Sequence, residues 1–74
     1  MKQFKDKYEL AAFIQEAVIK KFNLLEPWQQ VLPASFYCSE AEQMQIIKEA
    51  GYNLDNLLED PAVDPEYIER FNRI

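Results

Sequence analysis

The chain has 74 residues, with 13 acidic residues against eight basic ones and a net charge of −5. It is 49% hydrophobic and contains ten aromatic residues, a composition too apolar for a disordered chain. The single cysteine, Cys38, and the absence of histidine exclude an internal disulfide and a Cys/His zinc site. We expect one small domain over residues 1–74, with no cofactor and no bound metal.

The sequence also bears on the compartment. No apolar run approaches the roughly 20 residues that span a bilayer, and the N-terminus MKQFKDKYEL lacks the apolar segment of a signal peptide. A lone thiol fits a reducing compartment. We therefore expect a cytoplasmic protein with no membrane partner.

The charges are unevenly distributed. Residues 1–22 carry five lysines against three acids, whereas residues 23–74 carry ten acids against three bases. Between Asn53 and Glu69 there are six acids and no base. Because nucleic-acid affinity depends largely on Lys and Arg displacing counterions, direct binding of DNA or RNA is not expected.

The first predicted helix runs from about Asp6 to Asn23. Asp6 can cap its first turn, and Lys20 and Lys21 offset the dipole in its last turn. Its apolar residues recur at spacings of three and four, which places on one stripe Leu10, Phe13, Ile14, Ala17, Val18, Phe22 and Leu25.

Two prolines bound the next segment. Pro27 suits a first helical turn and Pro33 ends it, so Pro27–Leu32 is predicted to be one short helix. We expect Trp28, Val31 and Leu32 to face the core. The connector that follows, 34–38, carries Phe36 and Tyr37, which are predicted to cover the edge of the core.

A capping box marks the second main helix. Ser39 and Glu42 have the required spacing, and the helix is predicted to end at Ala50, with Gly51 in a left-handed conformation. Tyr52, just beyond, is expected to fold back on Ile47.

The C-terminal third is predicted to hold two further helices. Asn53 can cap a short one, Leu54–Glu59, with three leucines inward, namely Leu54, Leu57 and Leu58. Asp64 and Pro65 open the last helix, which places on one side Tyr67, Ile68, Phe71 and Ile74, and spaces the pairs Glu66–Arg70 and Glu69–Arg73 at i,i+4. Strand signals are essentially absent. The predicted fold is all-α, a small compact bundle of three main helices plus one or two short helical turns.

The residues offer little for catalysis. Without histidine, a general base near neutral pH would need a carboxylate or lysine with a strongly shifted pKa. Cys38 precedes the Ser39 cap, where a helix N-terminus could activate a thiol. We prefer the interpretation that Cys38 is a small buried hydrophobe beside Phe36 and Tyr37, and expect the chain not to be an enzyme.

Two features can bind a partner. The acids from Asp55 to Glu69 form either a solvated surface or a face that engages a basic groove, including one that normally holds DNA. The second feature is a surplus of aromatics. Phe4 and Tyr8 extend the apolar surface of the first helix, and Trp28, Phe36 and Tyr37 cluster in the middle of the chain. These rings either add burial to the core or form an exposed patch. The predicted partner-binding residues are Asp55, Glu59, Asp60, Asp64, Glu66, Glu69, Trp28, Phe36 and Tyr37.

Part of the chain carries a family resemblance. The run EPWQQVL at 26–32, the run SEAE at 39–42 and the ending IKEAGY at 47–52 resemble the small nitrogen-fixation-associated leader-like helical domains of cyanobacteria, over residues of about 10–58. The chain departs from that family in extra residues at 32–38, in lacking a Gly-Gly processing site and in its additional C-terminal helix. The resemblance implies a small helical module that another protein recognises.

Together these features predict a protein-binding module, acting as an adaptor, regulator or inhibitor by occupying a surface of another protein. A second hypothesis is a structural homo-oligomer in which the lysine-rich first helix pairs with the acidic C-terminal region of a neighbour. A third is an enzyme that uses Cys38.

Overall fold

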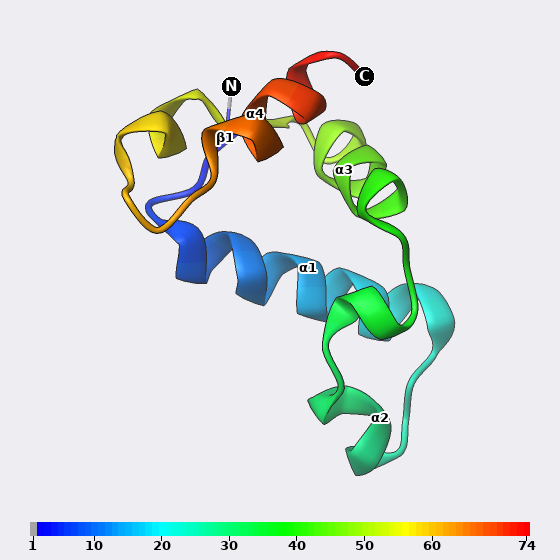
Figure 1. The fold of residues 1–74 in the computed structure, drawn as a ribbon. Coiled ribbons are helices and arrows are strands. Elements are labelled where there is room, and N and C mark those ends of the chain that lie inside the picture. Colours follow the sequence, from blue (N-terminus) through cyan, green and yellow to red (C-terminus); the bar gives the residue numbers. More distant parts are fainter. Residues whose placement is uncertain (1) are drawn as a thin grey trace.

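The computed structural model describes residues 2–74 (Figure 1). Its elements follow in the order β1 (Lys2–Gln3), α1 (Lys7–Phe22), α2 (Pro27–Val31), the 3₁₀ turn η1 (Ala34–Phe36), α3 (Glu40–Glu49), β2 (Tyr52–Asn53), the 3₁₀ turn η2 (Asp55–Glu59) and α4 (Pro65–Asn72). The all-α prediction is confirmed, with α1, α3 and α4 as the main helices. The one departure is a short parallel pair in which Lys2 lies opposite Tyr52 and Gln3 opposite Asn53.

The helix starts lie where the capping residues predict them. The Asp6 side chain accepts a hydrogen bond from the Glu9 amide at 3.0 Å, and α1 begins at the next residue, Lys7. In the capping box of α3, the Ser39 hydroxyl accepts from the Glu42 amide, while the Glu42 carboxylate accepts from the Ser39 amide, both at 3.2 Å. Asp64 accepts from the Glu66 amide at 2.9 Å and opens α4.

The end of α1 corrects part of the predicted apolar stripe. Asn23 takes a left-handed conformation with φ 53°, and the Leu24 amide donates to the Ile19 carbonyl at 3.0 Å. This reversal turns Leu24 into the core. The prediction for Leu25 was wrong because the helical period stops at Asn23 and leaves its side chain exposed. The prediction for Phe22 was also wrong, since this last residue of α1 is exposed.

One hydrophobic core joins the helices. α1 contributes Leu10, Ile14 and Val18, and α3 contributes Met44 and Ile47. The remaining buried members are Phe4, Leu24, Cys38, Leu54, Leu57, Ile68 and Phe71. Each main helix therefore buries one stripe against the others.

Phe4 is a core residue that does not belong to α1. Its side chain is 1% exposed and its ring stacks on that of Tyr52, with centroids 4.0 Å apart. Tyr8, by contrast, is 79% exposed. The prediction that these two extend the apolar surface of the first helix was wrong, since the Asp6 cap starts the helix after Phe4. Tyr52, expected to fold back on Ile47, has its ring on Phe4.

The short turn η2 is a 3₁₀ helix, and this changes which leucines are buried. With three residues per turn, Leu54 and Leu57 lie above one another, and both are buried. Leu58 is rotated out of that row and is exposed, contrary to the prediction. Ile74 lies beyond α4 and is also exposed, whereas Ile68 and Phe71 are buried as predicted.

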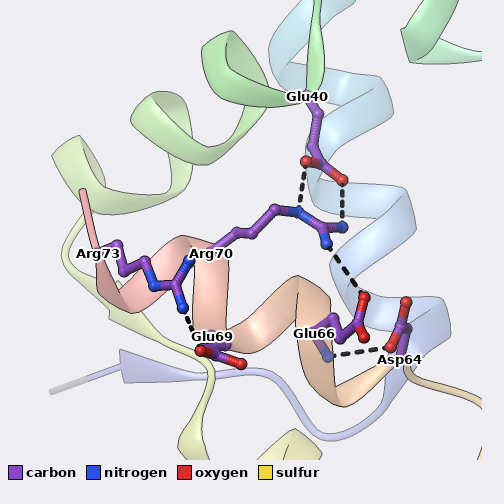
Figure 2. A network of polar contacts seen from close by, with 6 residues as sticks. All are labelled: Glu40, Asp64, Glu66, Glu69, Arg70 and Arg73. Carbon is purple, nitrogen blue, oxygen red and sulfur yellow. Dashed lines mark hydrogen bonds and ion pairs between the residues drawn. The ribbon is translucent and has the colours of Figure 1, made fainter.

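A polar network fixes α4 to α3 (Figure 2). The Arg70 guanidinium donates to both carboxylate oxygens of Glu40, at 2.9 and 3.0 Å. The predicted i,i+4 pairs are also present, with 3.9 Å between Arg70 and Glu66 and a direct hydrogen bond from Arg73 to Glu69. The bond to Glu40 raises the pKa of Arg70, which stays charged.

Candidate functional site

Helix α2 is the element with the least packing. None of its residues is buried; Trp28 is 61% exposed and Val31 is 81% exposed. The prediction that these two face the core was wrong, and Leu32 is only half-buried. In Figure 1, α2 lies below the C-terminal half of α1, on the side away from α3 and α4, so neither of those two helices covers it.

Hydrogen bonds, rather than apolar contacts, hold α2 in place. The Gln15 side chain on α1 donates to the carbonyls of Gln30 and Leu32, at 2.8 and 2.9 Å. Three further bonds, of 2.9–3.1 Å, run from Gln30 Nε2 to the Leu24 carbonyl, from the Tyr37 hydroxyl to the Gln29 carbonyl and from the Glu26 amide to Gln29 Oε1. The segment is therefore ordered while its apolar side chains stay in solvent.

Aromatic rings gather where this segment returns to the bundle. The Tyr37 ring lies 5.1 Å from that of Phe36 and 6.3 Å from that of Phe22, between centroids. Lys21 Nζ lies 5.8 Å from the centroid of Phe22. Tyr37 packs against the core as predicted, but Phe36 is exposed, so the prediction that it covers the core edge was wrong.

Most of the exposed large hydrophobic side chains belong to this part of the chain. Over residues 2–74, eight large hydrophobic side chains are exposed, and five of them lie between positions 22 and 36. We call these five the arm surface: Phe22, Leu25, Trp28, Val31 and Phe36. All five lie within the segment 22–36, and exposed hydrophobics that gather in one region are typical of interaction sites.

The predicted acidic residues lie elsewhere and differ in what they do. Asp60 accepts hydrogen bonds from the amides of Lys7 and Ala62 and thereby ties the loop to the start of α1. Asp64 caps α4, and Glu66 and Glu69 pair with arginines. Asp55 and Glu59 on η2 are exposed, and within the described chain their carboxylates have no partner.

The two predicted sets do not form one site. The acids lie on η2, α4 and the loop between them, at the opposite end of α1 from α2 (Figure 1). A cavity of about 270 Å³ opens at this acidic end, lined by Lys7, Leu10, Ala62, Val63, Asp64 and Tyr67. Sequence reasoning missed the cavity because its walls come from positions more than 50 residues apart.

The side chains available for chemistry are few. Cys38 is 2% exposed, and burial raises the pKa of its thiol, with the nearby Glu42 carboxylate acting in the same direction. This confirms the interpretation of Cys38 as a buried hydrophobe. Burial also raises the pKa of the Tyr67 phenol, next to Glu40.

Positions 2–74 hold neither a cluster of metal ligands nor a membrane-spanning helix. No three side chains of the metal-ligating types come together there. None of the helices in that range has the length and apolarity needed to cross a bilayer.

We compared the chain with models of protein families, with curated proteins and with solved structures, and none of them matched. The resemblance to the leader-like domains therefore stays a prediction from the motifs.

Proposed function

We propose that this chain is a small protein-binding module of the cytoplasm, which acts by occupying a surface of another protein through its arm surface rather than by catalysis. The observation that carries the proposal is α2, an ordered helix that buries none of its residues and exposes Trp28 and Val31.

Burial energetics support this use of the arm. Covering a Val or Leu side chain is worth about 1.5–3 kcal/mol, and the bundle leaves Leu25 and Val31 almost entirely in solvent. On α2, Trp28 and Val31 are three residues apart and share one face. Two apolar anchors at this spacing suit a helix that docks into an apolar groove.

Order in the free state supports the same conclusion. Association loses affinity when side chains or loops must first be ordered. The bonds from Gln15 to the Gln30 and Leu32 carbonyls, at 2.8 and 2.9 Å, fix α2 before any partner arrives. The arm surface can therefore bind without first having to fold.

The acidic end supports a second candidate, an inhibitor that occupies a basic groove. Asp55 and Glu59 are exposed and, within residues 2–74, unpaired. Their charge would steer a basic partner towards this end. The remaining acids already accept bonds from backbone amides or pair with arginines, so the arm surface is the stronger candidate.

The test is affinity capture from the source cells with the full chain as bait. A double variant, Trp28→Ala with Val31→Ser, removes the arm anchors, and the matched control, Tyr8→Ala with Leu58→Ser, removes two side chains elsewhere that are also more than half exposed. We expect the wild type and the control to retain the same protein, and the arm variant to lose it, with all three equally helical by circular dichroism.

Two results would argue against the proposal. If the arm variant retains that protein as well as the wild type does, the arm surface is not the binding surface. If neither the wild type nor the control holds any protein above the level of empty beads, the chain is not a binding module. Loss of binding by Asp55→Asn with Glu59→Gln, but not by the arm variant, would favour the acidic end.

A further inference from the structure

The cavity at the acidic end is suited to one large apolar side chain. Leu10, Val63 and Tyr67 form apolar walls, and Lys7 and Asp64 lie at its polar edge. Its volume is about 270 Å³, and an apolar cavity of about 150 Å³ already accepts a benzene ring. An indole ring therefore fits the available space.

The arm surface presents such a side chain. Trp28 is the only tryptophan of the sequence, and most of its side chain is in solvent. Tryptophan is among the residues most enriched at the energetic centres of interfaces. Because α2 is held by backbone-directed hydrogen bonds, Trp28 can leave the solvent without disturbing the core.

The charges around the two surfaces are opposite in sign. Over residues 17–39 the chain carries Lys20 and Lys21 against a single acid, Glu26. The cavity is lined by one base, Lys7, and one acid, Asp64, and it lies beside the segment from Asn53 to Glu69, which has six acids and no base. Opposite potentials at two contacting surfaces steer association and set orientation.

We propose that the arm surface binds a second copy of this chain, with Trp28 of one copy entering the cavity between α1 and α4 of the next. This rests on the proposed function, because it uses the same surface, and it names the partner. The molecule is 36 Å along its longest axis, and α2 lies at the opposite end of α1 from the residues that line the cavity (Figure 1). The contact is therefore head-to-tail, and it builds either an open chain of copies or a closed ring.

We expect this contact to be weak because it buries little surface area. One side chain in one cavity buries much less surface than the roughly 1,200 Å² of a standard stable interface. We therefore expect an average mass near that of the 8.8 kDa monomer at low concentration, rising between about 10 µM and 1 mM. Added salt lowers this rise, because it screens the lysines from the acids.

The test is multi-angle light scattering on two complementary variants and their mixture. Trp28→Ser disables the arm and leaves the cavity, whereas Ala62→Arg fills the cavity and leaves the arm. Each variant alone is expected to stay monomeric, with self-association weakened by about 30-fold or more. Mixed in equal amounts, they form a complex that stops at two copies, because each supplies one working surface. Tyr8→Ser serves as the control and associates like the wild type.

The outcomes separate this inference from the proposed function. A wild type that stays at 8.8 kDa up to 1 mM, or two variants that do not combine when mixed, overturns the inference. If the wild type is monomeric and the arm variant still loses a captured protein, the partner is a different protein and the proposed function stands. If neither self-association nor arm-dependent capture occurs, both fail.

Discussion

The placement of Phe4 makes the sharpest prediction about stability. Its ring is 1% exposed and contacts two other rings, with centroids 4.0 Å from Tyr52 and 5.4 Å from Phe13. In Phe4→Ala the apolar burial is lost and a cavity is left between α1 and β2. Such substitutions cost about 3–5 kcal/mol.

This loss is large for a chain of this size. At about 0.05–0.15 kcal/mol per residue, a 74-residue protein has a free energy of unfolding of about 4–11 kcal/mol. Phe4→Ala therefore removes from about a quarter to all of the stability. Since each kcal/mol lowers the melting temperature of a small domain by about 4–8 °C, we expect a fall of at least about 12 °C.

The matched control is Tyr8→Ala, four residues along. Tyr8 is 79% exposed, and surface substitutions usually change stability by less than about 0.5 kcal/mol. Thermal melts followed by far-ultraviolet circular dichroism measure both variants. If Phe4→Ala melts within about 4 °C of the wild type, the segment before α1 is not docked in the core. Equal falls for both variants would show that the two rings share one helical surface, as the sequence periodicity predicts.

Four other substitutions and one labelling experiment test local features. Ser39→Ala removes the cap of α3 and should lower the free energy of unfolding by about 1 kcal/mol in a urea titration. Hydrogen bonds from Ser39 lower the pKa of Glu42. The stabilisation by this carboxylate is therefore present above the pKa of an unfolded glutamate and is lost as the pH falls through the lowered folded pKa. Glu42→Gln can still accept the bond, so it should lose less stability in acid than the wild type. Burial raises the pKa of Cys38. We expect its alkylation by iodoacetamide at neutral pH to be roughly 100-fold slower than in urea, because the thiol must first be exposed. An equal rate in both conditions would contradict its burial. Gly51 has φ +86° with nothing within 4 Å of an added Cβ, so Gly51→Ala should cost about 1–2 kcal/mol through backbone strain alone, measured by a thermal melt. Gln15→Ala removes both bonds to the arm and should speed hydrogen exchange of the α2 amides but not of the α3 amides; unchanged α2 exchange would show that these bonds do not hold the arm.

The features that the sequence predicts correctly are local ones. A cap is a contact between residues two or three positions apart, so Asp6, Ser39 and Asp64 mark their helices without any knowledge of the fold. The same is true of the left-handed Gly51 and the prolines that open α2 and α4. The helices and the all-α class follow from these signals together with the apolar periodicity.

The features that the sequence predicts wrongly depend on contacts between residues far apart in the chain. Periodicity shows which residues share a face, but not whether anything packs against that face, so Trp28 and Val31 look like core residues. Phe4 enters the core by pairing beside Tyr52, across almost 50 positions, which no local pattern signals. The exposed Leu58 depends on η2 being a 3₁₀ rather than an α-helix, a difference that its sequence does not encode.

The candidate sites follow the same division. Phe36 and Trp28 were predicted as partner-binding residues because aromatics cluster in the middle of the chain, and the structure leaves both exposed. The acids were predicted as one surface, yet Asp60 and Asp64 are occupied with backbone amides, which depends on where the loop before α4 lies. The cavity could not be predicted without the fold, because its lining residues come from both ends of the chain.

The arrangement separates the residues that hold the fold from those proposed to bind. The core contains only Leu24 from the segment between α1 and η1, and α2 contributes nothing to it. Substitutions at Trp28 or Val31 should therefore change binding and leave unfolding nearly unchanged, whereas in most interfaces the two effects are mixed. The ordering of α2 depends instead on hydrogen bonds, each worth about 1 kcal/mol, that use the side chains of Gln15, Gln29, Gln30 and Tyr37 but not those of Trp28 or Val31. Trp28 and Val31 can thus be substituted while the bundle beneath them stays the same.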